Sequence, residues 1–197
     1  MNVYYRPMRT KDDEKREALF EATVKLVNEV GFAASSVSKI AKEANVSAAT
    51  LYIYHKNKED LLVSTYLEIK SDLSDAILAG FDTDVPLRDI LRKVWFNLFG
   101  YVSNNLRHYK YIDQFANSPF STLVDKKVTE KYFVPLFEVL QNGIQQKIIK
   151  DVNRDILSAF LWAPAAFLAN SRLCESFEVN ENNIDTAFTL AWDAIKL

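Results

Sequence analysis

Two short helical segments joined by a tight turn, within residues 35–55, constrain the fold of this chain more than any other feature. Apolar residues recur at helical spacing on both sides of Asn45, and asparagine tolerates the left-handed backbone of such a turn. Ala41 is small enough for the two segments to cross closely, Leu51 faces inward, and Ser47 caps the second segment. The sequence therefore predicts a helix-turn-helix, in which the second helix enters the major groove of DNA.

Helical periodicity continues along almost the whole chain, and four glycines in 197 residues are too few for a turn-rich β fold. A first helix begins at a capping box of Thr10 and Asp13 and ends where Gly31 takes a left-handed conformation. Ser35 or Ser36 caps the second helix. Further helices are predicted at 57–79, 86–106, 107–117, 121–148 with a break near Pro135, 153–175 and 183–196. We therefore predict an all-α chain of about nine helices.

Residue usage argues against several classes of protein. An apolar fraction of 49% with 25% charged residues is typical of a folded globular chain. The glycine positions form no nucleotide-binding loop, and two histidines with one cysteine cannot make a Cys/His zinc site. A nucleophilic pair of Cys174 and His108 has no local support, so we expect no metal, no cofactor and no enzyme activity.

The single cysteine also excludes an internal disulfide framework and favours a reducing compartment. The longest apolar run, Ala159–Ala169, is interrupted by Pro164 and is shorter than the roughly 20 residues of a membrane span. No signal peptide opens the chain. We expect a cytoplasmic protein without a membrane contact.

Charge is distributed unevenly. Residues 1–58 contain ten Lys/Arg and seven Asp/Glu, whereas the whole chain has a net charge of −2. A mildly basic head on an acidic body is compatible with nucleic-acid binding, although the difference is small.

Residues 31–62 resemble the DNA-binding region of the TetR family of bacterial transcriptional repressors. The resemblance covers about the first 65 residues, and the remainder is similar only in length and helical character. The matching motif residues are Gly31, Ser35-Ser36, Ile40-Ala41, Val46-Ser47, Thr50-Leu51-Tyr52 and Lys58.

Three positions depart from the family pattern. Asn45 and Ala49 stand where the family usually has glycine, and Ala49 leaves less room for close approach of the backbone to DNA. His55 stands where a packing phenylalanine is common. It can fill that packing position or contact a phosphate.

The resemblance implies a set of DNA contacts. Phosphate contacts are expected from Ser36, Thr50, Tyr52, Tyr54 and Lys58, which fix position and register but do not read sequence. Ala48 and Ala49, after Ser47 at the start of the recognition helix, would face the groove and offer apolar contact to a thymine methyl group. Ser47, Lys39 and His55 complete the predicted set of DNA contacts, with a solvated lysine as the alternative for Lys39.

The resemblance also implies two domains, a DNA-binding head at 1–56 and a ligand-binding and dimerisation body at 57–197. A small-molecule effector, largely apolar or aromatic, would bind in the body, and the helix from residue 57 would transmit binding to the head. Asp113 and Glu138 are the nearest acidic candidates for a cationic effector, while aromatic residues at helical spacing can also be plain core. The predicted effector contacts are Trp95, Phe99, Phe115, Phe137, Trp162, Phe167 and Asn170.

The last two predicted helices suggest a homodimer. The segment 156–174 is apolar on nearly every side, and the final helix carries one clean stripe. Pairing of these helices with their symmetry mates would present two recognition helices to a pseudo-palindromic operator in double-stranded DNA. The alternative is that both helices close the core of a monomer. The stripe consists of Ile184, Ala187, Phe188, Ala191, Trp192 and Ile195.

The sequence thus favours a ligand-responsive DNA-binding regulator, most simply a repressor. Two other functions stay open: a helix-turn-helix regulator whose body binds a protein partner, and an enzyme or small-molecule carrier that retains the head.

Overall fold

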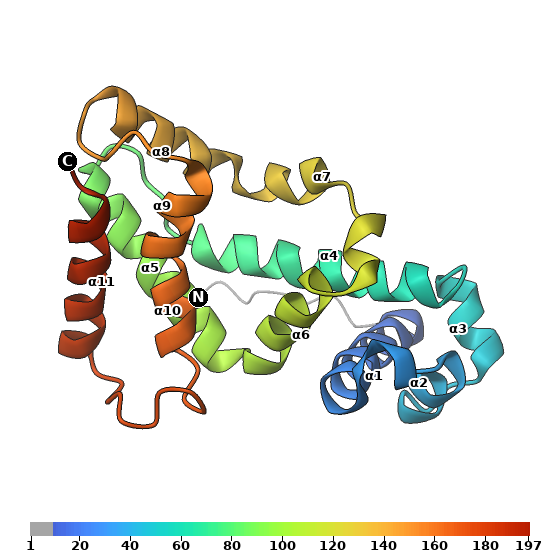
Figure 1. Cartoon of the computed structure of the whole chain (residues 1–197). Helices are drawn as coiled ribbons and strands as arrows, with labels where there is room; N and C mark the ends of the chain where they lie inside the picture. The colour runs from blue at the N-terminus through green and yellow to red at the C-terminus, as the bar shows by residue number, and fades with distance from the viewer. Residues whose placement is uncertain (1–9) are drawn as a thin grey trace, which may run out of the picture. The chain divides into compact units, whose positions relative to one another are not determined.

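The chain is all-α, as predicted. The computed structural model describes residues 10–197, and within that range it has eleven α-helices, two short 3-10 helices and a single isolated β-bridge between Ile149 and Lys196 (Figure 1). The number of helical segments exceeds the prediction because the segments predicted at 121–148 and 153–175 are each divided.

The chain divides into two compact units. The first comprises residues up to Leu67 together with Lys110–Val124, and the second comprises Glu68–Tyr109 with Asp125–Leu197. Helices α4 (Lys58–Ile77) and α6 (Leu106–Ala116) each contribute residues to both units. The division into a DNA-binding domain at 1–56 and a ligand-binding and dimerisation domain at 57–197 stays a prediction. Residues 1–9 of the first predicted domain lie outside the described part of the chain.

The first unit opens with three helices: α1 (Lys11–Ala34), α2 (Val37–Glu43) and α3 (Ala48–Tyr54). The capping box at Thr10 and Asp13 is confirmed. Ser36 and Ser47 are the N-caps of α2 and α3, and each side chain accepts a hydrogen bond from the backbone N–H three residues on. Asn57 caps α4 in the same way, with its Oδ1 2.7 Å from the Asp60 nitrogen.

Two residues with positive φ shape this unit. Gly31 has φ 77° and ψ 169°, a conformation largely reserved for glycine, and α1 is broken there before its last three residues. Asn45 has φ 54°, which turns the chain between α2 and α3. The Val46 N–H donates to the Ala41 carbonyl across that turn, at 2.9 Å. The predicted tight turn is therefore confirmed.

A small apolar core holds α1, α2, α3 and the start of α4 together. A leucine or isoleucine side chain in such a core stabilises the fold by about 1.5–3 kcal/mol when it is fully buried. Ile40 and Leu51 are completely buried, and Val46 packs half-buried against the cluster. The buried members are Leu19, Ala22, Ile40, Ala41, Ala44, Leu51 and Leu61.

The C-terminal half of α6 completes the first unit through aromatic contacts. The Phe115 ring stacks on Tyr66 of α4 at 4.2 Å between centroids, and its edge-on contact with Phe32 is at 5.9 Å. The buried Tyr111 hydroxyl donates to the Leu62 carbonyl at 2.9 Å. Gln114 donates to the Asn28 side chain at 2.7 Å. These contacts tie α6 to α1 and α4.

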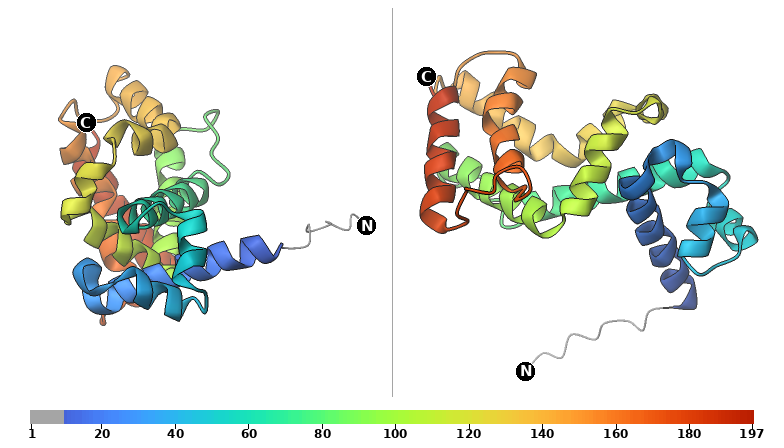
Figure 2. Two further views of the ribbon diagram at one scale, coloured as in Figure 1. Left: turned by 90° about the vertical axis from the view of Figure 1, so that its right-hand side faces the viewer. Right: turned by 60° about the horizontal axis from the view of Figure 1, so that its bottom comes forward.

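The second unit has α5 (Leu87–Asn104) at its centre. Helices α9 (Arg154–Leu161) and α10 (Ala163–Leu168) follow one another end to end next to it, and α11 (Glu181–Ile195) lies beside them (Figures 1 and 2). The fully buried Trp95 of α5 donates its indole N–H to the Leu161 carbonyl at 2.8 Å. Its ring meets Phe188 of α11 at 6.1 Å, so α5, α9 and α11 share one core.

Two helix predictions were wrong in their extent. The region 121–148 forms η1 (Pro119–Leu123), α7 (Lys126–Glu130), η2 (Lys131–Phe133) and α8 (Val134–Gln145). The main break precedes Pro135, since proline is favoured in the first turn of a helix and disfavoured further in. The region 153–175 ends as helix at Leu168, because the chain turns at Asn170, whose Oδ1 accepts from the Arg172 nitrogen.

Candidate nucleic-acid interface

The recognition helix α3 presents an uncharged face to solvent. Leu51 is fully buried, whereas Tyr52 is 55% and Ile53 77% exposed. Ala48 and Ala49, one turn earlier, are exposed as well. The four exposed residues Ala48, Ala49, Tyr52 and Ile53 are called the reading face below. Ile53 was absent from the predicted contacts, although its position two residues after the inward Leu51 already placed it outside.

The predicted phosphate contacts Ser36 and Thr50 lie at the starts of α2 and α3. The Ser36 hydroxyl is 3.0 Å from the Ser38 hydroxyl, and the Thr50 hydroxyl is 2.9 Å from that of Ser47. Both hydroxyls are therefore fixed close to helix N-termini, where backbone N–H groups favour an anion.

Lys39 is exposed near the start of α2, and its ammonium donates to the Ala34 carbonyl at 3.0 Å. This hydrogen bond uses one of three N–H donors. The other two stay available for a phosphate.

Tyr54 is held by α1. Its hydroxyl donates to Asp12 Oδ1, and the Arg16 guanidinium lies over its ring at 5.0 Å from the centroid. The hydrogen bond to Asp12 is the main reason that the pKa of Tyr54 lies above its usual value of 10.0. A phosphate contact by this hydroxyl would have to compete with Asp12.

Lys58 connects two helix ends. Its ammonium donates to the Phe32 carbonyl at 2.6 Å, just beyond the break at Gly31. The residue is half-buried at the first position of α4. Lys58 therefore has a structural contact that the sequence did not predict, and it retains two donors for a phosphate.

His55 is largely buried after the end of α3, with 17% of its side chain exposed. Its Nδ1 is 3.2 Å from the Ser64 hydroxyl and 3.5 Å from Asp60 Oδ2. Burial lowers the pKa of His55 below its usual value, and Asp60 partly opposes that shift. This geometry agrees with the packing interpretation of His55.

The predicted effector contacts do not form one group. Trp95 and Phe99 stack on each other at 6.2 Å within the core of the second unit, whereas Phe115 belongs to the aromatic group of the first unit. Trp162 is half-buried between α9 and α10, and Asn170 is half-buried in the turn after α10. Their effector role stays a prediction.

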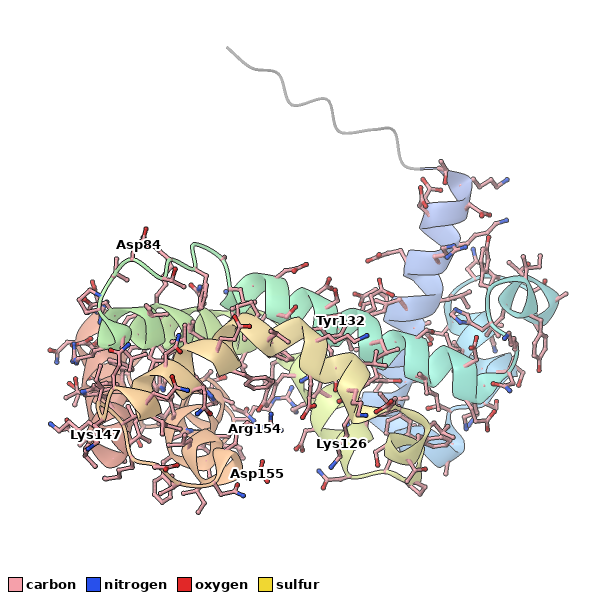
Figure 3. All side chains as sticks on the ribbon, turned by 90° about the horizontal axis from the view of Figure 1, so that it is seen from above. Asp84, Lys126, Tyr132, Lys147, Arg154 and Asp155 are labelled. Carbon is pink, nitrogen blue, oxygen red and sulfur yellow. The ribbon has the colours of Figure 1, made fainter. Side chains whose placement is uncertain are left out.

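Arg154, labelled in Figure 3 at the start of α9, covers Phe137, another predicted effector contact. Its guanidinium lies 4.7 Å from the centroid of the Phe137 ring and 2.7 Å from Glu130 Oε1. Two carboxylates considered for a cationic effector, Asp113 and Glu138, are exposed.

A pocket of about 380 Å³ in the second unit is lined by other residues. It lies between the loop that joins α4 to α5 and the end of α8, the segments in which Figure 3 labels Asp84 and Lys147. No charged side chain lines it, and its polar groups are one hydroxyl and two amides. The lining residues are Thr83, Val85, Pro86, Leu87, Ile90, Val139, Asn142, Gly143, Gln146 and Ile148.

The predicted stripe of the last helix faces the chain's own core. Phe188, Ala191, Trp192 and Ile195 are buried within the second unit, so this stripe corresponds to the monomer-core alternative. Leu190 is the large apolar residue that α11 exposes, at 68%.

Helices α9 and α10 carry the exposed apolar surface instead. Its residues follow at three- and four-residue spacing and include Phe160 and Phe167, each more than half exposed. This surface, called the α9–α10 stripe below, consists of Ile156, Ala159, Phe160, Ala163 and Phe167. Phe167, predicted as an effector contact, points to solvent here.

Between residues 10 and 197, no three His, Cys, Asp or Glu side chains are grouped so that they could hold a metal ion. Over the same range, no helix combines the length and apolar character needed to cross a membrane.

Comparison with known families covers most of the chain. Residues 19–65 match the model described as "Bacterial regulatory proteins, tetR family", and residues 86–196 match "Tetracyclin repressor-like, C-terminal domain". The first match contains α2, α3 and most of α1. The second spans α5 to α11.

Individual relatives agree with these matches. An HTH-type transcriptional regulator of Haemophilus influenzae is 25% identical over 190 residues, which is 96% of this chain and all of that protein. A crystal structure of a TetR family transcription regulator from Marinobacter aquaeolei VT8 is 36% identical, covers 96% of this chain and 99% of its own, and has a TM-score of 0.88.

A fatty acid metabolism regulator of Bacillus subtilis is 48% identical over only 50 residues, 25% of this chain and 26% of that protein.

Because the full-length relatives and both family models are transcription regulators, the helix-turn-helix is a DNA-binding domain and not part of an enzyme. The chain belongs to the TetR family of transcriptional regulators.

Proposed function

We propose that the protein is a ligand-responsive repressor that binds a pseudo-palindromic operator as a homodimer in the bacterial cytoplasm. The observation that carries this proposal is the arrangement of α3. Its reading face is uncharged and exposed, while hydroxyl or ammonium groups of Ser36, Lys39, Thr50 and Lys58 lie at nearby helix starts. The hydroxyl and ammonium groups would contact phosphates and so fix the position of the protein on DNA. The reading face would contact base edges with few polar groups.

The α9–α10 stripe supports dimerisation. Exposed apolar residues at helical spacing are unusual on the surface of a monomer and mark an interaction site. Leu190 adds an exposed apolar residue on α11, and α9 and α11 pack against each other. A two-fold pairing through these helices would place two copies of α3 on successive major grooves, about 34–36 Å apart or more.

An uncharged pocket supports an apolar effector. Its volume of about 380 Å³ is within the range of small-molecule sites, and its amides and single hydroxyl provide hydrogen bonds without charge. The long helix α4 contributes residues to both units, so a shift of its second half would move its first half also. The effector must bind the DNA-free state more tightly than the DNA-bound state, and this difference limits the response.

Repression is tested in the host by deletion of the gene. Transcripts next to the bound sites should rise when the gene is deleted and fall again on complementation. A fall on deletion would identify an activator and contradict the proposal.

A protein partner stays the second candidate, because the same α9–α10 stripe could be covered by another chain. Purification from the host at native expression level decides between them. A homodimer alone supports the proposal, and a stoichiometric second protein on the stripe supports the alternative.

A further inference from the structure

We infer that Ile53 reads the 5-methyl groups of thymine, so that the operator is recognised largely through apolar contacts in the major groove. This inference rests on the DNA-binding function and adds a residue and a chemical feature of the DNA to it. Ile53 has the largest exposed fraction, 77%, among the exposed large hydrophobic residues of the described chain. It lies on the solvent side of the recognition helix, opposite the buried Leu51.

The chemistry of the reading face limits what it can recognise. Guanine is read mainly by arginine or lysine and adenine by asparagine or glutamine, and none of these occurs in α3, whose sequence is AATLYIY. Tyr52 has one hydroxyl, and Ala48, Ala49 and Ile53 offer only apolar atoms. The thymine methyl is the apolar group that a base pair presents in the major groove.

Ile53 also differs from its neighbours in what else it could contact. The hydroxyls of Tyr52 and Thr50 can donate to phosphate oxygens, but an isoleucine cannot. Tyr54, the next residue, is turned toward α1 by Asp12 and Arg16. Among the apolar members of the reading face, Ile53 is the largest and therefore has the most surface to bury against a methyl group.

The test uses duplexes selected by the full-length protein from a random-sequence library. Each enriched duplex is then made again with deoxyuridine in place of thymidine, which removes the methyl and leaves the hydrogen-bonding groups. Native protein should bind the uracil duplex about fourfold more weakly for each contacted methyl, and more weakly still when both half-sites lose one.

Ile53→Ala assigns the contact to this residue. The variant should fold normally, because the side chain is exposed and alanine is a better helix former than isoleucine. The ratio of its affinity for the thymine duplex to its affinity for the uracil duplex should be smaller than the ratio for native protein, by about fourfold per contact. Leu123→Ala, another exposed apolar residue of the first unit, should keep the full native difference.

Two results would overturn the inference. Native protein could bind thymine and uracil duplexes equally, or Ile53→Ala could keep the full native sensitivity to uracil. Enrichment of no duplex at all would instead count against the DNA-binding function itself, so the two failures are distinguishable.

Discussion

At the scale of single residues, two side chains of the predicted DNA-contacting set also stabilise the head. Lys58 donates to the Phe32 carbonyl, and His55 packs beside Ser64 and Asp60. The sequence indicated the position of each residue relative to the helices, but not the partner that its polar group contacts. A long side chain such as lysine finds its partner through tertiary structure, in this case 26 residues away along the chain.

Lys58→Ala should lower the free energy of unfolding by about 1–2 kcal/mol, because the Phe32 carbonyl loses a charged donor. Thermal or urea unfolding in the absence of DNA measures this effect. Lys56→Ala, an exposed neighbour without such a side-chain contact to α1, is the control and should change stability little. Equal stability of native protein and Lys58→Ala would contradict the structural role.

The same variant tests the phosphate contact. If Lys58 also binds a phosphate, Lys58→Ala should weaken binding to all DNA sequences similarly and reduce the salt slope by about one. A loss confined to one operator sequence would argue against a phosphate contact.

His55 should make stability depend on pH. Because burial lowers its folded-state pKa below 6.5, the unfolded chain binds the proton more readily. Stability from this group is therefore complete above pH 6.5 and declines as pH falls from there toward the lowered pKa. His55→Phe should reduce the difference in unfolding free energy measured at pH 7.5 and pH 5.5. An unchanged difference would show that other groups cause it.

At the scale of elements, the sequence predicted helix starts better than helix extents. Caps are local, and Thr10 with Asp13, Ser36 and Ser47 act where the pattern placed them. The break predicted near Pro135 is confirmed, but the extent of the 121–148 prediction was wrong because three short helical segments and one longer helix share the same periodicity. The break of α1 at Gly31 was indicated correctly by a glycine after the apolar stripe.

Two glycines should respond oppositely to the same substitution. Neither Gly31 nor Gly100 has another atom within 4 Å of an added Cβ, so space does not distinguish them. Gly31 has φ 77° and ψ 169°, so Gly31→Ala should destabilise by about 1–3 kcal/mol. Gly100 lies inside α5, and Gly100→Ala should stabilise by about 0.5–1 kcal/mol. Urea unfolding of both variants checks the signs, and a neutral Gly31→Ala would contradict the strain.

At the scale of the whole molecule, periodicity identified apolar faces but not their partners. The stripe of α11 was assigned to a dimer, yet Phe188 meets Trp95 inside the same chain. The sequence did not distinguish the α9–α10 stripe, because the segment 156–174 is apolar on nearly every side. Phe115 was assigned to the body, although the fold returns it to α1 and α4. Such choices depend on contacts between distant segments, which a single sequence does not specify.

The proposed dimer predicts a change in mass. Phe160→Glu should convert the dimer to a monomer, since a carboxylate in an apolar interface loses its hydration without a partner. Sedimentation equilibrium measures the mass, and circular dichroism verifies the fold. Leu123→Glu, exposed in the first unit, is the matched control and should remain a dimer. A dimeric Phe160→Glu would place the interface elsewhere.

The most direct measurement is recovery of host DNA by the purified protein. Sheared chromosomal DNA is incubated with it at moderate salt, and the bound fragments are sequenced. A specific regulator should enrich one or a few pseudo-palindromic sites whose half-sites are about 10 base pairs apart or more between centres. Diffuse recovery that decreases steadily with salt, without an enriched site, would contradict the claim that this head reads an operator.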